Sequence, residues 1–143
     1  MLHDLTIFYH MLIAAALGLC IGWERKSRKY QIGHRTYALV ALGAAAAISI
    51  AAERFPGSEA EVMAGILAGI GFLGAGIIAK RDSGEARGLT TAASVWATAA
   101  MGIMVGSGDY FLGILSAGLI VVVLGWNRLM RLLFKNIESD EGE

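Results

Sequence analysis

Five apolar runs, each nearly as long as a bilayer is thick, leave this chain few folds to adopt. A helix needs roughly 20 apolar residues to cross the ~30 Å hydrocarbon core of a membrane. The composition agrees, because 56% of the 143 residues are hydrophobic, only 17% are charged and the mean hydropathy is +0.60. The sequence therefore predicts an all-α, polytopic membrane protein: a single transmembrane domain, residues 1–143, built as a five-helix bundle. The predicted spans are residues 5–23, 36–52, 62–79, 90–106 and 110–126, with a short tail at 127–143.

The basic residues fall on one side of these spans. Of the 12 Lys and Arg residues, all but Arg54 lie in segments 25–35, 80–87 and 128–135, which share one face of a five-span protein. Short loops rich in Lys and Arg stay in the cytoplasm. We therefore predict that the N-terminus lies outside and the C-terminus and its tail are cytoplasmic. The run at residues 25–29 can also attract anionic lipids of the bilayer at about 1 kcal/mol per basic residue, which is a membrane-surface property and does not indicate nucleic-acid binding.

Glycines are concentrated in the third apolar run. Gly69, Gly71 and Gly74 have the G-x-G-x-x-G spacing of a dinucleotide site, but that motif needs a strand before it and a helix that starts at it. Here the glycines lie inside an unbroken apolar run, Val62–Ala79. Small residues in membrane helices instead allow a second helix to approach closely. We predict a tight bundle and a homodimer held by small-residue faces, with these helix-packing glycines: Gly65, Gly69, Gly71, Gly74, Gly76 and Gly102.

Charged residues at the ends of the spans are the candidates for function. Glu24 and Arg25 close the first span, and Arg35 and Arg87 precede the second and fourth. One interpretation makes them interfacial anchors whose charged ends reach the headgroups. In the other, Glu24 pairs with Arg35 or Arg87 in a buried or half-buried network, which is either structural or part of a binding site.

Hydroxyl groups are the remaining polar candidates. Those of Thr90, Thr91, Ser94 and Thr98 could bind an ion weakly, although such groups more often bond to their own helix. No Asp or Glu lies mid-span, Cys20 is the only cysteine, and the three histidines are scattered, so the sequence predicts no metal site, no cofactor and no catalytic set. The histidines are His3, His10 and His34.

Two blocks of this sequence resemble one family. Gly22–Arg25 (GWER) followed by Gly33–Thr36 (GHRT) is similar to the opening of the MgtC/SapB family, and Gly69–Gly76 (GIGFLGAG) followed by Arg87–Ala93 (RGLTTAA) is similar to its most diagnostic block. The resemblance covers nearly the whole chain. It implies a bacterial inner-membrane protein of four or five spans that is not an enzyme.

The resemblance also implies a function. Family members are associated with growth in low magnesium and with survival inside macrophages, and the best-studied kind is similar to a regulator that binds other membrane proteins, including the F-type ATP synthase. The alternative is a small dimeric transporter or channel for magnesium or another cation. Two departures bear on this expectation. The virulence-type proteins carry a soluble C-terminal domain that is not expected here, and they tend to have Asn where this chain has Thr90.

Overall fold

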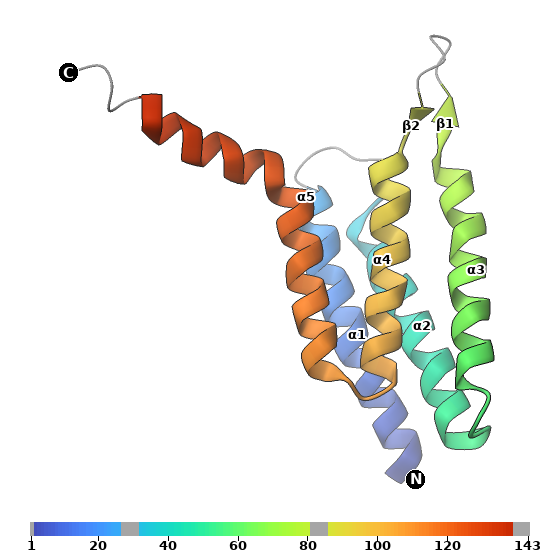
Figure 1. The fold of residues 1–143 in the computed structure, drawn as a ribbon. Coiled ribbons are helices and arrows are strands. Elements are labelled where there is room, and N and C mark those ends of the chain that lie inside the picture. The colour runs from blue at the N-terminus through green and yellow to red at the C-terminus, as the bar shows by residue number, and fades with distance from the viewer. Residues whose placement is uncertain (1, 27–31, 81–85, 139–143) are drawn as a thin grey trace.

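Five helices of the computed structural model run alternately up and down (Figure 1). The structure describes residues 2–26, 32–80 and 86–138. Between α3 and α4, two short strands pair antiparallel, with Ala79 opposite Arg87. We call the end of the bundle that carries the strands the strand end, and the opposite end, where α2 turns into α3 and α4 into α5, the turn end. The elements are α1 (Leu2–Lys26), α2 (His34–Arg54), α3 (Glu59–Ile77), β1 (Ala79–Lys80), β2 (Ala86–Arg87), α4 (Leu89–Gly106) and α5 (Tyr110–Glu138).

The helices bear out the coarse prediction from the sequence. Four of them, α1 to α4, are long and apolar enough to cross a membrane, and α5 has a shorter apolar part, Tyr110–Trp126. The protein is therefore an all-helical membrane bundle. Which side of the membrane each terminus occupies stays a prediction, as does the crossing of the fifth helix.

Local sequence explains where the helices end at the turn end. Helix α2 stops at Arg54 because Pro56, which has no backbone N–H, and Gly57, with φ of 94°, follow it. Helix α4 stops at Gly106, and Gly108 turns the chain with φ of 89°. Both turns lie where the sequence predicts them.

Two elements differ from the prediction. The last span was predicted to end at Trp126, and the helix that contains it, α5, continues through the predicted tail as far as Glu138. The loop between the third and fourth spans forms the strand pair, which the sequence did not predict. Gly88 follows β2 with φ of 89°, and a side chain there would meet the carbonyl oxygen of Ile77 at 2.6 Å. Only glycine fits that close turn into α4.

Helix α4 is the centre of the bundle, and small residues let its neighbours approach. A Cβ added at Gly102 would lie 2.5 Å from the carbonyl oxygen of Ala41, and one at Gly106 would lie 2.6 Å from that of Ala45, so the backbones of α2 and α4 are in contact there. Although α4 is the least apolar span, more than half of it is buried. Its neighbours therefore shield much of this helix from lipid.

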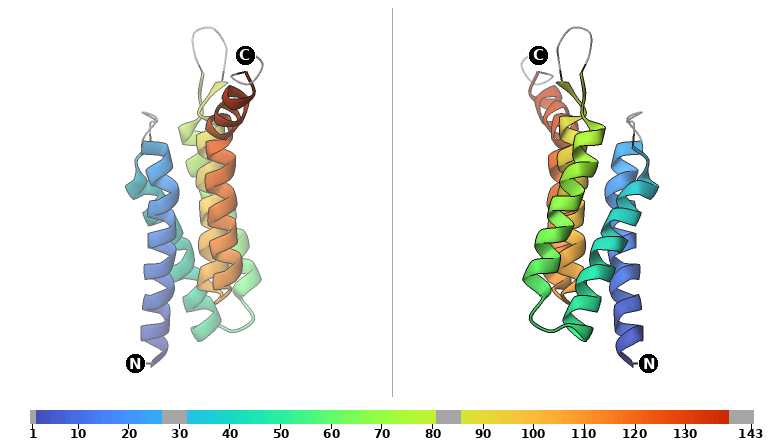
Figure 2. Two further views of the ribbon diagram at one scale, coloured as in Figure 1. Left: turned by 90° about the vertical axis from the view of Figure 1, so that its left-hand side faces the viewer. Right: turned by 90° about the vertical axis from the view of Figure 1, so that its right-hand side faces the viewer.

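The bundle is closer packed toward the turn end than toward the strand end. Figure 2 shows α1 and α2 as a pair beside a group formed by α3, α4 and α5, with α2 leaning toward that group near the turn end. Gly18 and Gly22 of α1 lie against the α2 backbone at Tyr37 and His34 and hold the pair together. At the strand end, long side chains bridge the pair to α4, and these side chains form the candidate site.

Candidate functional site

A buried arginine joins α1 to α4 at the strand end. Arg25 lies one residue before the end of α1, and Thr91 lies in the first turn of α4. The Arg25 side chain is only 2% exposed, and its Nη2 donates a hydrogen bond of 3.0 Å to Thr91 Oγ1. A guanidinium is always charged, and a buried charge is costly unless polar groups surround it. The position of Arg25 is therefore set by polar contacts and is not that of an anchor in the headgroups.

Hydroxyl groups continue this contact into the bundle. Ser94 Oγ donates to the carbonyl oxygen of Thr91 at 2.8 Å, and it lies 2.7 Å from the hydroxyl of Tyr37 on α2. Because a serine has one proton to donate, the Tyr37 hydroxyl is the donor to Ser94. One turn on, Thr98 Oγ1 donates to the Ser94 carbonyl at 2.8 Å. The order Tyr37 to Ser94 to Thr91 thus ties α2 to α4, as Arg25 ties α1 to α4. We call Arg25, Tyr37, Thr91 and Ser94 the hydroxyl cluster.

The structure separates the site residues that the sequence had grouped together. Arg25 and Thr91 meet, whereas Arg35, Arg87 and Thr90 are exposed. Glu24 is half-buried, with one carboxylate oxygen shielded from solvent. Its predicted pairing with Arg35 or Arg87 stays a prediction.

Sequence reasoning missed one member of the cluster. Tyr37 is fully buried, although it stands near the start of a span where tyrosine commonly lies at the membrane surface. A signal was present on α4, because Thr91, Ser94 and Thr98 follow one another at helical spacing and so share a face. Nothing in the sequence of α2 shows that Tyr37 faces this stripe.

The glycines predicted to pack fall into two groups. Gly102 contacts the α2 backbone at Ala41, and a Cβ at Gly74 would meet the Cβ of Ala92 at an ordinary 3.6 Å. At the other four predicted glycines, no atom of the described residues lies within 4 Å of the place where a Cβ would lie, so these residues show no close helix contact there. These four are Gly65, Gly69, Gly71 and Gly76.

A second buried polar group lies toward the turn end, from a histidine that the sequence had treated as isolated. His10 of α1 is 8% exposed, and its Nδ1 lies 2.8 Å from Ser49 Oγ on α2. Ser49 Oγ in turn donates to the carbonyl oxygen of Gly106 at 2.8 Å. Since the serine proton is used there, the His10 imidazole is the donor to Ser49 and cannot act as its base. The trio therefore joins α1, α2 and α4 and does not form a nucleophile.

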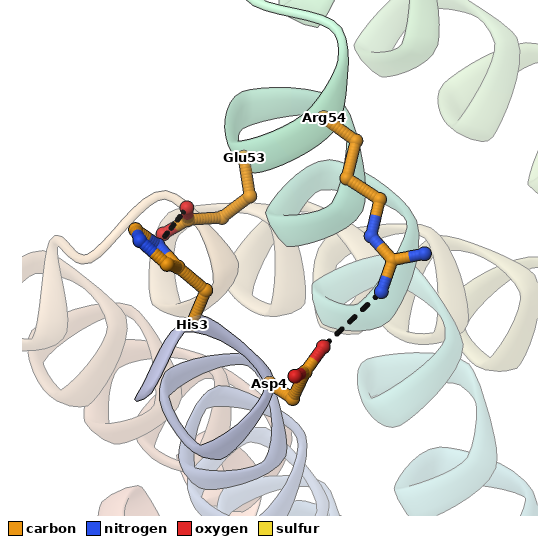
Figure 3. Close-up of polar contacts among 4 residues, drawn as sticks. All are labelled: His3, Asp4, Glu53 and Arg54. Atoms are coloured by element: carbon orange, nitrogen blue, oxygen red, sulfur yellow. Dashed lines mark hydrogen bonds and ion pairs between the residues drawn. The ribbon is translucent and has the colours of Figure 1, made fainter. Parts of the chain in front are cut away.

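Charged residues close the turn end where α1 meets the last turn of α2. Figure 3 shows His3 beside Glu53, and Arg54 Nη2 paired with Asp4 Oδ1 at 3.2 Å. The Arg54 and Asp4 side chains are more than half exposed, and exposed ion pairs contribute only about 0–1 kcal/mol. These pairs align the two helix ends but form no enclosed site.

The hydroxyl cluster supplies one fixed cation and neutral hydroxyls. Within residues 2–26, 32–80 and 86–138, no group of three or more His, Cys, Asp or Glu side chains could hold a metal ion. These groups donate and accept the hydrogen bonds that join α1 and α2 to α4 at the strand end.

Comparisons with known proteins agree with the two sequence blocks. The profile of the MgtC family matches residues 11–132. The chain is 41% identical over 138 residues to the protein MgtC of Salmonella typhimurium, covering 94% of this chain and 58% of that protein. It is 41% identical over 126 residues to MgtC of Brucella abortus, covering 87% and 51%. It is 35% identical over 143 residues to the protein SrpB of Synechococcus elongatus, covering 90% and 79%.

These similarities concern only part of each MgtC protein. The chain spans little more than half the length of the MgtC proteins it matches. No solved structure gives a significant match.

Proposed function

The chain belongs to the MgtC family, and from that premise we propose that it is a non-enzymatic protein of the bacterial inner membrane that regulates other membrane proteins by binding them. The proposed setting is adaptation to low magnesium or a related stress, as the family resemblance implies. A membrane partner such as the F-type ATP synthase fits this role, and a homodimer is the proposed basic unit.

The observation that carries the proposal is the open outer side of α3. Gly74 is the only buried residue of this helix. Gly65, Gly69 and Gly76 recur at helical spacing with Phe72, whose side chain is 85% exposed. Within the part of the chain that the structure describes, nothing lies within 4 Å of where side chains on these glycines would be. We call these four residues the open α3 face.

Glycine at such positions needs a physical reason. A glycine inside a helix is less favourable than alanine by about 1 kcal/mol, and a lipid chain gains little from the missing methyl group. A second helix gains more, because small residues let two backbones approach and make dispersion contacts over a long stretch. The open α3 face is therefore suited to another helix.

A second copy of this chain is the partner that the face fits. From Val62 to Ile77 the helix carries no charged residue, so two copies could pack about a twofold axis without burying a charge. Beside the face, an apolar groove of about 440 Å³ between α3 and α4 offers room for side chains of the partner. Its lining is Ile70, Gly71, Gly74, Ala75, Ile78, Ala92, Ala93 and Trp96.

Disulfide cross-linking in native membranes tests the proposal. In a Cys20→Ala background, a cysteine at Gly69 should give a cross-linked dimer on mild oxidation. Gly43 is the matched control, because it is an equally open glycine on α2, and a cysteine there should give no dimer. Equal cross-linking from both positions, or none from Gly69, would contradict a contact through α3.

A growth assay connects the face to the proposed role. Gly69→Leu should reduce complementation of a deletion strain in low magnesium, because the larger side chain holds a partner helix away. Gly43→Leu should complement normally. If Gly69→Leu also complements fully, the open α3 face has no part in the function.

The competing function is transport of a cation by the dimer. The observation that favours it is the line of buried hydroxyls along α4 at Thr91, Ser94 and Thr98. Against it, the α2 and α4 backbones are in contact at Gly102 and Ala41, one turn beyond Thr98, so the line of hydroxyls does not continue between these two helices. Measuring cation flux with purified protein in liposomes distinguishes the two functions. Saturable cation flux that is lost with Glu24→Ala would support transport and contradict the regulatory function.

A further inference from the structure

The second part of α5 leaves the bundle. After its apolar part, Tyr110–Trp126, the helix continues from residue 127 to Glu138. Figure 1 shows this last part, coloured red, turning sideways away from the other helices at the strand end. In Figure 2, turned by 90°, the same part is seen nearly end-on, which agrees with a course across the axis of the bundle. At 1.5 Å per residue, residues 127–138 reach roughly 18 Å.

The sequence of this part is that of a two-sided helix. Arg128, Arg131 and Lys135 are spaced by three and four residues, so they share one side by helical register. Five of the six apolar residues of this part fall at register positions on the other side, spaced by three, four or eight residues, while Leu132 falls beside Arg128 on the basic side. These five are Leu129, Met130, Leu133, Phe134 and Ile137. This pattern is typical of helices that lie in a membrane interface and do not cross it.

The position of the bend corresponds to the membrane surface. Trp126 is the last residue of the apolar part of α5 and is 52% exposed, and Trp23 near the end of α1 is 68% exposed at the same end of the bundle. Tryptophan gathers at the boundary between headgroups and hydrocarbon. Because α1 to α4 run across the membrane and the bent part runs across them, that part lies along the membrane plane.

The charges at the strand end indicate which lipid surface the basic side of this helix contacts. The strand end also carries the basic residues Arg25, Arg35 and Arg87, so the prediction that this end is cytoplasmic places the bent part on the leaflet where anionic lipids concentrate. Near an anionic surface, each basic residue favours the bound state about fivefold, so three favour it on the order of a hundredfold. A neutral surface provides no such preference.

We propose that residues 127–138 form an in-plane helix that binds the anionic phospholipid surface at the strand end, with its apolar side in the acyl-chain boundary and its basic side among the headgroups. Binding of this helix to the lipid surface would make the position of α5 depend on the anionic lipid content of the leaflet. Because α5 packs on α4, the position of α4 would depend on it as well. The proposal is independent of the regulatory role.

Fluorescence quenching on the full chain tests the depth of this helix. In a Cys20→Ala background, an environment-sensitive dye is attached to a single cysteine at Leu133 or at Lys135, which the helical register puts on opposite sides. The protein is placed in vesicles of phosphatidylcholine with one-quarter phosphatidylglycerol, and the quencher is a lipid brominated near its headgroup. The quencher is present in both leaflets, so both orientations of the protein report.

The expected result is strong quenching at Leu133 and at least threefold weaker quenching at Lys135. In vesicles of phosphatidylcholine alone, and with Arg128→Gln and Arg131→Gln together, quenching at Leu133 should fall at least twofold. Arg35→Gln is the matched control, because Arg35 is an exposed basic residue of the same end on α2, and it should change nothing.

Two outcomes would overturn the proposal. Equal, weak quenching at both positions in anionic vesicles would show a helix that stands away from the membrane. Weak quenching at Leu133 that becomes strong when the protein is diluted tenfold in lipid would show that the helix packs on another protein molecule.

Discussion

Gly102→Ala should destabilise the protein strongly, whereas Gly71→Ala should not. The added Cβ at Gly102 would lie 2.5 Å from the carbonyl oxygen of Ala41 and 3.0 Å from its Cα. Ordinary contacts are about 3.5–4.0 Å, so α2 and α4 must separate by roughly 1 Å along their central contact. At Gly71 nothing lies within 4 Å.

Comparing Gly102→Ala with Gly71→Ala isolates the free-energy cost of separating α2 from α4. Replacing glycine by alanine inside a helix gains about 1 kcal/mol of helix propensity at either position, so that gain cancels when the two are compared. Overpacking costs about 1–3 kcal/mol, and the upper part of that range applies because backbone, which cannot change rotamer, is the obstacle. At about 2–4 °C per kcal/mol for a chain of this size, the Tm of Gly102→Ala should be roughly 4–12 °C lower than that of Gly71→Ala.

Thermal unfolding in mild detergent, followed by the intrinsic fluorescence of the tryptophans, measures the difference. Dilute, monomeric protein is needed, since a contact between copies near α3 could add a cost at Gly71. The sequence alone predicted Gly71 as a packing glycine, so the comparison tests the structure directly. Melting temperatures within about 1 °C of each other would refute the close contact between α2 and α4.

Three further predictions concern the membrane topology and the residues of the strand end. In a Cys20→Ala background, a cysteine at Ser107 should react with an impermeant thiol reagent in intact cells while one at Gly33 is protected; the reverse pattern would invert the predicted topology. Thr91→Val removes a hydrogen-bond acceptor from the buried guanidinium of Arg25 and should lower the free energy of unfolding by about 1.5–3 kcal/mol. The control Thr90→Val, at the exposed neighbouring position, should change it by no more than about 0.5 kcal/mol. Equal effects of the two variants on unfolding in detergent would contradict the hydroxyl cluster. Glu24→Gln should leave the protein inserted but weaken growth in low magnesium, and full complementation would reduce Glu24 to a structural anchor.

The candidate site was only partly predictable from the sequence. Arg25 and Thr91 could both be selected, because a charge and a hydroxyl at span ends are rare in so apolar a chain. Their contact could not be predicted, because it depends on where the end of α1 lies relative to the start of α4. The same is true of His10, which looks isolated in the sequence and lies beside Ser49 only after α1 and α2 pair.

Hydropathy by itself determined that this chain is a helical membrane bundle, where most of its helices begin and end, and that its basic residues gather at one end. These properties follow from the sequence because the free energy of leaving water is set residue by residue, and because proline and glycine act on their own turn of the chain. Only the tertiary structure decided which glycines meet a neighbour. In lipid, an apolar helix face loses little by staying against acyl chains, so the selection among such faces comes from backbone fit between particular helices. That fit brings Gly102 against α2 and leaves Gly69 open for a partner.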